Sequence, residues 1–327
     1  MIYFETGSLD PHYNLAFEET ILLRKSSENY LILWQNDKSV IIGQNQNVES
    51  ELNMDFVRTN KIPVVRRITG GGAVFHDLGN LNYSFISDLP GDISEATRNF
   101  TMDVVRALRH LGLRAEASGR NDILVNGKKV SGTAQRINGN RILFHGTLLF
   151  CSDLSMLSRV LNPHPEKYQT KGISSVRARV GNILDYLSPD YTMDAFKSAV
   201  RESLCGSQLQ YASELTAVEA AEVKALAETK YNSPSWNIGR FPVYERSCRK
   251  NFPGGALEVR LTVSEDRIRD ILFLGDFLSV RSMIDLTPLF NGILFEREAV
   301  ERVLQSLPLS DYFGSLSIEQ ILETVFN

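Results

Sequence analysis

Apolar residues recur at helical spacing in two stretches of the first third of the chain. The first stretch follows Asp10-Pro11, a pair typical of a helix N-cap and first turn, and continues to residue 22. The second covers residues 94–111 and ends before Gly112, a residue type that commonly terminates helices. The pattern predicts one helix in each stretch.

Short runs rich in β-branched and aromatic residues predict strands around these helices. Residues 30–34 and 40–42 are two such runs, and the polar segment 36–38 between them predicts a hairpin. Asn126-Gly127 and Asn138-Gly139 each lie between β-rich runs, and Asn-Gly in that position favours a type I′ turn. The same criteria predict further strands at residues 62–67, 73–75, 81–86, 257–263 and 268–274.

The order of these elements predicts an α+β fold, with a mixed, largely antiparallel sheet and flanking helices. Helical patterns dominate residues 154–204, 212–230 and 298–307, and Tyr231 to Ser235 breaks the second of them. A chain of 327 residues favours two domains. We place the boundary between residues 235 and 253, which gives a large domain of residues 1–240 and a small α+β domain of residues 241–327.

Composition narrows the class of protein. The net charge is −4, from 35 basic and 39 acidic residues, which argues against a nucleic-acid partner bound through a basic face. The start of the chain does not have the pattern of a signal peptide, and no apolar run is long enough to span a membrane. The three cysteines are widely spaced, which fits a reduced, cytoplasmic protein better than a disulfide framework: Cys151, Cys205 and Cys248. We therefore expect a soluble cytoplasmic protein.

Three consecutive glycines form the most informative motif of the chain. Gly70, Gly71 and Gly72 follow two arginines and precede an apolar run that ends in His76-Asp77. Glycine lets main-chain N–H groups approach a ligand closely, and successive N–H groups can form a concave anion site. A glycine triplet between strands is most often a plain tight turn. The arginines before it and the His-Asp pair after it favour an anion-binding site here.

Other polar residues have both a structural and a functional interpretation. Two lysines at a hairpin are usually solvated, and we keep that interpretation for Lys128. Lys129 precedes small and polar residues that allow close backbone approach, which weakly favours a functional role. Asn121-Asp122 opens a strand, where such residues often form turns. His145 could be a hydrogen-bonded core residue, as could the histidine at the end of the glycine motif.

The segment RRITGGGAVFHDLGNLNYSF, residues 66–85, closely resembles the signature of the lipoate–protein ligases. The resemblance continues in order over nearly the whole chain, at residues 10–11, 119–122, 129–134, 145–148, 171–177, 236–237 and the final segment. It implies a biotin/lipoate ligase-like fold. It also implies that residues 1–240 form a lipoate- and ATP-binding catalytic domain, and residues 241–327 the accessory domain of the longer ligases.

The resemblance implies an ATP-dependent activity. Such an enzyme uses ATP and Mg²⁺ to convert lipoate to lipoyl-AMP, and then transfers the lipoyl group to a lysine of a carrier protein. The implied partners are the apo lipoyl domains of 2-oxoacid dehydrogenase acyltransferase subunits and the glycine-cleavage carrier protein. No nucleic-acid or membrane partner is implied.

The resemblance also implies roles for particular residues. In this family, the lysine that corresponds to Lys129 contacts both the lipoate carboxyl group and the adenylate phosphate, which makes Lys129 the expected catalytic residue. The implied magnesium ligand is Asp122. The implied ATP-binding residues are Arg67, Gly72, Ala73, Val74, Phe75, Asn121, Asp122 and Lys129. The implied lipoate-binding residues are Gly43, Gly71, His76, Lys129, Ser131, Gly132, His145 and Gly146.

Other activities remain open for a chain of this fold. It could transfer preformed lipoyl-AMP without activating lipoate, act as an octanoate- or biotin-type ligase, or only bind a carrier protein. The arginine-glycine-rich adenylate loop of biotin ligases is not present in that form. Related transferases that form a thioester need a nucleophilic cysteine, which in one group lies just before the His-Gly dipeptide, where this chain has residues 142–144. Cys151 lies beyond an apolar strand and is expected to be buried, so a thioester route is disfavoured.

Overall fold

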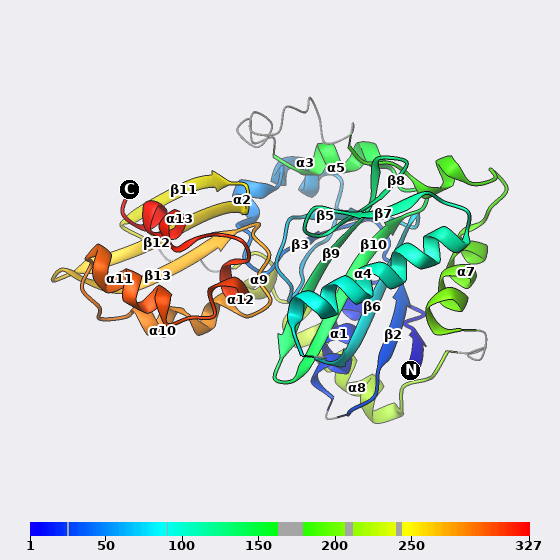
Figure 1. The fold of residues 1–327 in the computed structure, drawn as a ribbon, viewed down its shortest axis with the longest axis horizontal. Coiled ribbons are helices and arrows are strands. Elements are labelled where there is room, and N and C mark those ends of the chain that lie inside the picture. Colours follow the sequence, from blue (N-terminus) through cyan, green and yellow to red (C-terminus); the bar gives the residue numbers. More distant parts are fainter. Residues whose placement is uncertain (25, 90, 163–178, 207–211, 240–243) are drawn as a thin grey trace.

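The computed structural model describes residues 1–327 except 25, 90, 163–178, 207–211 and 240–243. A seven-stranded sheet forms the centre of the large domain, and a three-stranded sheet forms the centre of a small C-terminal domain (Figure 1). Across the large sheet the strands lie in the order β1 (Ile2–Glu5), β2 (Tyr30–Trp34), β6 (Asn80–Asp88), β10 (Arg141–Leu149), β9 (Lys128–Asn138), β8 (Asp122–Val125) and β7 (Ala115–Ser118). A second small sheet in the large domain has the order β4 (Val64–Arg66), β3 (Ser39–Ile42) and β5 (Val74–His76).

The pairing of the strands confirms the predicted fold class. In the large sheet β1 and β2 are parallel, and every other neighbouring pair is antiparallel. The helices of the large domain are α1 (Pro11–Leu23), α2 (Val48–Glu51), α3 (Met54–Thr59), α4 (Ile93–His110), α5 (Leu154–Val160), the 3₁₀ helix η1 (Ile183–Tyr186), α7 (Met193–Cys205), α8 (Ala217–Leu226), the π-helical turn η2 (Ala227–Tyr231) and α9 (Pro234–Asn237). Among the described residues, no helix combines the length and the apolar composition needed to cross a bilayer.

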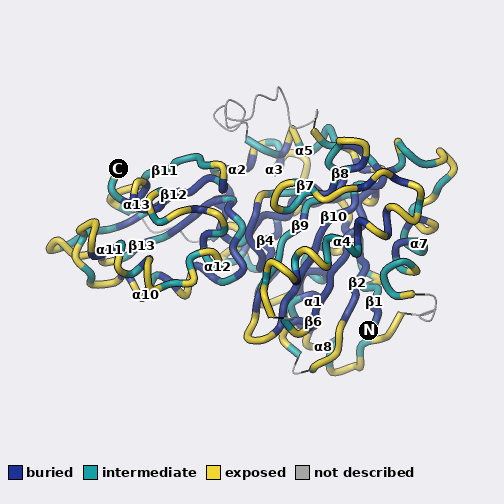
Figure 2. The backbone as a smooth tube through the Cα atoms, viewed as in Figure 1, coloured by how far each residue is buried: buried dark blue, intermediate teal, exposed yellow. Residues whose placement is uncertain are grey.

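Alternate residues of each strand in the large sheet pack on opposite faces. In β2, Leu31 and Leu33 join one core with α4 and α7, whereas Ile32 and Trp34 join the other with α1 and α8. Burying one such side chain stabilises the fold by about 1.5–3 kcal/mol. The buried strands run through the centre of the large domain and the helices lie outside them (Figure 2).

The two helices predicted near the N-terminus are confirmed. Helix α1 has Asp10 as its N-cap, and the Asp10 side chain accepts a hydrogen bond from the His12 N–H. Helix α4 ends at His110, and Gly112 has a positive φ of 79°, as expected for the residue that terminates a helix. The helix predicted over residues 212–230 starts later, because Thr216 and Glu219 form a capping box.

The hairpin predicted at residues 36–38 is wrong. Strand β2 pairs with β1 and β6, whereas β3 pairs with β4 and β5. All residues of both strands are buried, so each strand has both faces covered and the chain crosses from one sheet to the other between them. Asn36 is therefore an interior residue, hydrogen-bonded to Asn14 and His76.

One of the two Asn-Gly turns matches its predicted type. Asn126 and Gly127 have φ values of 48° and 78°, as a type I′ turn requires. At the other hairpin Asn138 pairs with Arg141, so the loop consists of Gly139 and Asn140. Gly139 has a positive φ and Asn140 does not, which indicates a type II′ turn rather than the predicted type I′. The hairpin is confirmed, but its loop is shifted by one residue.

The C-terminal domain has its own buried core, which draws its members from Leu257 to Val325. Its sheet contains β11 (Arg246–Phe252), β12 (Gly255–Ser264) and β13 (Arg267–Gly275), of which β11 was not predicted. Its helices are the 3₁₀ helix η3 (Met283–Asp285), α10 (Thr287–Phe290), α11 (Arg297–Gln305), α12 (Leu309–Phe313) and α13 (Ile318–Val325). The residue at which one domain ends and the next begins stays a prediction.

Candidate active site

A cavity of about 150 Å³ lies beside the glycine turn, between the large sheet and the sheet of β3, β4 and β5. Its walls include Leu15 of α1, Trp34 of β2, Ile41 of β3 and Val74 of β5. The cavity therefore collects residues from strands of two sheets and from a helix that covers them.

The structure brings most of the predicted site residues to this cavity. The predicted residues that line it are Arg67, Gly71, Gly72, Ala73, Val74, His76, Asn121, Lys129, Gly132, His145 and Gly146. This proximity is what one site would require, but it tests none of their individual roles, which stay predictions.

Four predicted residues do not line the cavity. Ser131 is fully buried, and its hydroxyl lies 3.4 Å from the hydroxyl of Tyr83. Phe75 packs in the core on the other side of the small sheet. Gly43 lies against the glycine turn, where an added Cβ would come within 2.0 Å of the Gly71 carbonyl oxygen. Asp122 borders a neighbouring hollow next to the α4 N-terminus.

Sequence reasoning missed several residues of the cavity wall. Asn82 and Thr147 pair with one another across β6 and β10, and His145 pairs with Ser84 in the same strands. These polar side chains occupy alternate positions on the face that carries α1. Asn82, His145 and Thr147 line the cavity, whereas the Ser84 hydroxyl donates to Glu18. Polar residues at every second position of an otherwise apolar strand were the available signal. The residues missed are Leu15, Trp34, Ile41, Asn82, Thr133, Ala134 and Thr147.

The buried side chain of Arg67 stabilises the glycine turn through hydrogen bonds to its main chain. Its guanidinium donates hydrogen bonds to the carbonyl oxygens of Gly70, at 2.7 Å, and Gly72, at 2.9 Å. Its Nε donates to the Thr69 hydroxyl at 2.9 Å. Burial lowers the pKa of Arg67 to about 10, so the group remains a cation at neutral pH. Arg67 therefore combines a fixed positive charge at the cavity wall with a bracing function for the turn.

A chain of buried hydrogen bonds continues from Arg67 to the core under α1. The Thr69 hydroxyl lies 2.8 Å from Nε2 of His145, and Nδ1 of His145 lies 2.8 Å from Oε1 of Glu18. The Ser84 hydroxyl donates to the same Glu18 oxygen at 2.6 Å. Because the carboxylate accepts, Nδ1 of His145 carries a proton, and a neutral His145 then accepts from Thr69 through Nε2. Both ring nitrogens of His145 are thus occupied by structural partners.

Arg66 has a different role from Arg67. It donates to main-chain oxygens of the loop after β3, including Gln46 at 2.7 Å, and to those of Trp236 and Asn237 at 2.9 Å and 3.0 Å. Burial lowers its pKa to about 10 as well. Arg66 does not line the cavity; it joins the end of the large domain to the strand before the glycine turn.

The C-terminal domain covers the outer side of the glycine turn. The Gly71 N–H donates to the Phe277 carbonyl at 3.2 Å, and Gly71 has a positive φ of 89°. A Cβ on Gly70 would come within 2.6 Å of the Ser279 nitrogen, whereas a Cβ on Gly72 would meet nothing within 4 Å. Gly70 and Gly71 therefore pack against the C-terminal domain, whereas Gly72 faces open space.

Lys129 and Asp122 form an ion pair at the edge of the cavity. The Lys129 Nζ lies 2.6 Å from Oδ1 of Asp122, and both side chains are partly exposed. The main chain of Lys129 pairs with residues 179–181, which fixes the base of the lysine. The predicted motif at residues 171–177 lies outside the described residues. Lys128 is half-buried and packs against Gly181, so it is less solvated than predicted.

The residues around Asp122 are compatible with Mg²⁺ only as a partial ligand set. Within the described part of the chain, no three His, Cys, Asp or Glu side chains gather as a metal site. Mg²⁺ in nucleotide enzymes is commonly held by one or two carboxylates together with substrate phosphates. Asp122 satisfies that requirement as one carboxylate beside a cation and a cavity.

Cys151 is exposed, so the expectation that it is buried is wrong. It does not line the cavity. Partial desolvation and the nearby Asp77 raise the pKa of its thiol, which keeps it protonated at neutral pH. A protonated thiol is a poor nucleophile, so the geometry gives no support to a thioester route.

Comparisons with known proteins agree with this arrangement. Residues 10–205 match the lipoyl protein ligase A/B catalytic domain, and residues 242–325 match the bacterial lipoate protein ligase C-terminus. The chain is 37% identical to the lipoate-protein ligase LplJ of Bacillus subtilis over 333 residues, which covers 100% of both chains. Its fold is similar to that of the crystal structure of P. falciparum LipL1 in complex with lipoate, with a TM-score of 0.78, 26% identity and 94% of each chain covered. It is also similar to a crystal structure of lipoate-protein ligase A bound with ATP, with a TM-score of 0.63, 30% identity, and 73% of this chain and 97% of that chain covered. The chain belongs to the lipoate–protein ligase family.

Proposed function

We propose that this protein activates lipoate with ATP and transfers the lipoyl group to a lysine of an apo lipoyl domain. The observation that supports this best is the position of Lys129, whose ammonium group lies beside Asp122 at the edge of a cavity bounded by the glycine turn. A carboxylate and a polyphosphate repel each other, and a positive charge between them offsets that repulsion.

The first reaction brings two anions together. A carboxylate oxygen of lipoate attacks the α-phosphorus of ATP, the bond to the β-phosphate breaks, and pyrophosphate leaves. Lys129 neutralises charge on the carboxyl and phosphoryl oxygens, and Arg67 supplies a second fixed charge at the cavity wall. Gly72, where an added Cβ would meet open space, lets a ligand approach the main chain.

Mg²⁺ would neutralise charge on the phosphates when bound, with Asp122 as its protein ligand. Asp122 also holds the Lys129 ammonium group in place, and Asn121 beside it lines the cavity. The Asn121 side chain donates to the Thr133 carbonyl at 3.0 Å, which ties the strand that carries the carboxylate to β9.

The second reaction transfers the acyl group. The amine of the acceptor lysine attacks the carbonyl carbon of lipoyl-AMP, the carbon–oxygen bond to AMP breaks, and the proton lost by the amine passes to solvent. The acceptors that suit this chemistry are the lipoyl domains of 2-oxoacid dehydrogenase acyltransferase subunits and the glycine-cleavage carrier protein. We place the reaction in the cytoplasm, where the three free cysteines would stay reduced.

Two assays test this proposal. An apo lipoyl domain incubated with the protein, lipoate, ATP and Mg²⁺ should gain the mass of one lipoyl group, and omission of ATP should abolish the gain. Synthetic lipoyl-AMP should restore it without ATP. Transfer from lipoyl-AMP with no pyrophosphate release from ATP would instead identify a transferase. If neither reaction occurred, the protein would have only a binding function.

A further inference from the structure

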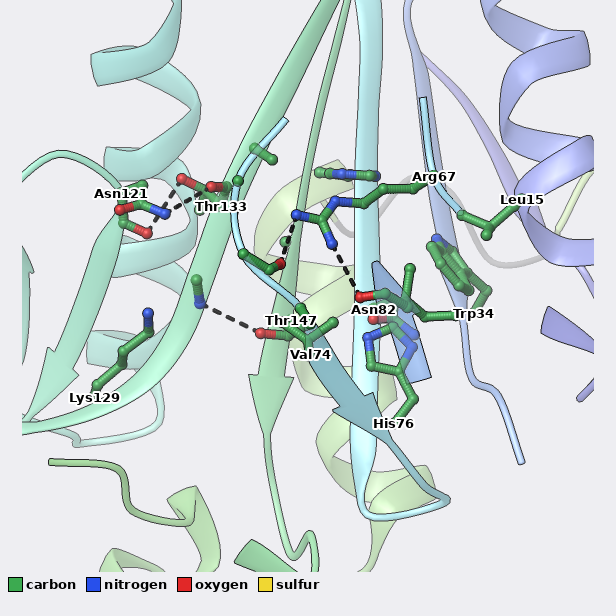
Figure 3. A pocket seen from close by; sticks show the side chains of 18 residues that line it. Leu15, Trp34, Arg67, Val74, His76, Asn82, Asn121, Lys129, Thr133 and Thr147 are labelled. Carbon is green, nitrogen blue, oxygen red and sulfur yellow. Dashed lines mark hydrogen bonds between the residues drawn. The ribbon is translucent and has the colours of Figure 1, made fainter. Parts of the chain in front are cut away.

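One end of the cavity is polar although it is remote from Lys129. Trp34, His76 and Asn82 stand together at this end, and Lys129 lies on the other side (Figure 3). The rings of Trp34 and His76 meet edge to face with centroids 6.1 Å apart, and Trp34 pairs with Asn82 across β2 and β6. An acyl chain whose carboxyl group lies at Lys129 would bring its far end toward these residues.

Neighbouring hydrogen bonds determine which nitrogen of His76 carries a proton. Nδ2 of Asn14 lies within hydrogen-bond distance of the carbonyl oxygens of Ser8 and Gln35, so it donates. The Asn36 atom that faces Asn14 is therefore its oxygen, at 2.8 Å, and the Asn36 nitrogen faces Nδ1 of His76 at 3.0 Å. Nδ1 of His76 accepts this bond, so the proton of the neutral ring is on Nε2.

That proton has no acceptor within the described protein. His76 is 3% exposed and Asn82 is 2% exposed. Nε2 of His76 and Nδ2 of Asn82 are both buried and lack a hydrogen-bond partner among the described residues. Burial above all, and then the neighbouring Arg67 cation and the His145 ring, lowers the pKa of His76 to about 3, so the ring is a neutral donor at neutral pH. Two buried, unpaired donors at this end of the cavity indicate a ligand that carries an acceptor there.

We propose that His76 and Asn82 recognise a sulfur atom at the far end of the acyl substrate, and so favour lipoate over octanoate. This inference rests on the proposed function and specifies its substrate. A ring sulfur is a weak, polarisable acceptor that also packs well against an aromatic edge, which Trp34 supplies. Octanoate has only a methyl group there and would leave both donors unpaired.

The expected discrimination is moderate. A buried donor left without a partner is costly, and sites built around such groups reject analogues that lack the matching atom. Because sulfur accepts weakly, we expect lipoate to exceed octanoate in kcat/KM by on the order of tenfold.

The test compares three acids on the same protein: lipoate, octanoate and 5-cyclopentylpentanoate, which keeps a five-membered ring but has no sulfur. Pyrophosphate release with ATP and Mg²⁺ gives kcat/KM for each. The ratio of the kcat/KM values for two acids does not depend on the fraction of enzyme that is folded, so a partly unfolded variant remains informative. In the wild type, lipoate should be preferred over both analogues.

The variants are His76→Phe and Asn82→Leu, which keep an aromatic ring and a side chain branched at the same carbon, respectively, and remove one donor each. Each should lower the ratio of lipoate to 5-cyclopentylpentanoate several-fold. His110→Phe, which removes an exposed imidazole, should leave it unchanged. Equal use of lipoate and the cyclopentyl acid by the wild type, or an unchanged ratio in both variants, would overturn the inference while leaving the ligase assignment intact. Absence of pyrophosphate release with every acid would instead overturn the proposed function.

Discussion

The ammonium nitrogen of Lys129 lies 2.6 Å from a carboxylate oxygen of Asp122, and the two residues come from adjacent antiparallel strands. Lys129 is opposite Leu124 and Asp122 is opposite Gly132, so the ion pair runs diagonally between the two strands. The ion pair holds the cation at the edge of the cavity, beside the carboxylate that is the candidate metal ligand.

Lys129→Ala should nearly abolish formation of lipoyl-AMP without unfolding the protein. The side chain is partly exposed, and it supports chemistry more than packing. Loss of a group that stabilises a developing anion typically costs roughly 3 kcal/mol, or about a hundredfold in rate. Pyrophosphate release is the measurement, and Lys128→Ala is the matched control and should stay close to wild type. A Lys129→Ala variant that activates lipoate at the wild-type rate would show that the assignment is wrong.

Asp122→Asn should raise the Mg²⁺ concentration needed for half-maximal pyrophosphate release. The amide removes the negative charge that a magnesium ion requires, but it keeps the shape and a hydrogen-bond acceptor for Lys129. Transfer from synthetic lipoyl-AMP, which needs no pyrophosphate chemistry, should change much less and serves as the control. An unchanged Mg²⁺ requirement would exclude Asp122 as a ligand of the metal.

Gly72→Val should weaken ATP and lipoate binding more than it lowers stability. An added side chain at Gly72 would enter open space, where a ligand must approach the main chain. Gly71 is less suitable for this test, because its φ is 89° and its Cβ would come within 3.1 Å of Arg67. Calorimetry measures both affinities, and unchanged values would reduce the glycine triplet to a structural turn. Gly70→Ala provides a contrast, since its Cβ would displace Ser279 of the C-terminal domain.

The sequence predicted the elements of this site better than their connections. Asp10-Pro11 and Gly112 mark helix ends through the chemistry of residues that are close in sequence, so these ends can be predicted without knowing the tertiary structure. The prediction of a hairpin at residues 36–38 was wrong because a polar, turn-like segment can also lie in the protein interior. Whether Asn36 is solvated or buried depends on Asn14 and His76, which are distant in the chain.

The residues at the far end of the cavity could not be predicted from the sequence for a similar reason. Trp34 and Asn82 meet only because β2 and β6 are neighbours in the sheet, although they are far apart in sequence. A single sequence carries the alternation of polar and apolar residues within each strand, but it does not carry the register between strands. The contact of Phe277 with the glycine turn likewise depends on how the domains pack.

The stability of the large domain should decrease on acidification partly through His76. Its pKa is about 3 in the folded chain, against an ordinary value of 6.5. The unfolded chain therefore binds a proton below about pH 6.5 that the folded chain does not bind until about pH 3. The stabilisation is complete above pH 6.5 and is lost as the pH falls, by up to about 1.4 kcal/mol per pH unit.

Urea unfolding of the wild type and His76→Phe at several pH values measures this difference. The two tryptophans, Trp34 and Trp236, both lie in the large domain, so their fluorescence reports its unfolding. The variant should show a shallower dependence on pH between about 6 and 4. The same dependence in both proteins would mean that His76 is protonated in the folded state.

A chain that ends after Gly239 should fold and should accept lipoyl-AMP, but it should activate lipoate poorly. The cut must follow Trp236 and Asn237, because both hold Arg66 just before the glycine turn. All cavity residues precede the cut, whereas Phe277 and Ser279, which cover the turn, follow it. Without that cover, water would reach the polyphosphate and weaken the electrostatic contacts on which activation depends. Pyrophosphate release and transfer from synthetic lipoyl-AMP, measured on the truncated and full-length chains, separate the two reactions. Full activation by the truncated chain would show that the C-terminal domain does not close the site, and loss of both reactions would show that the large domain does not end at this residue.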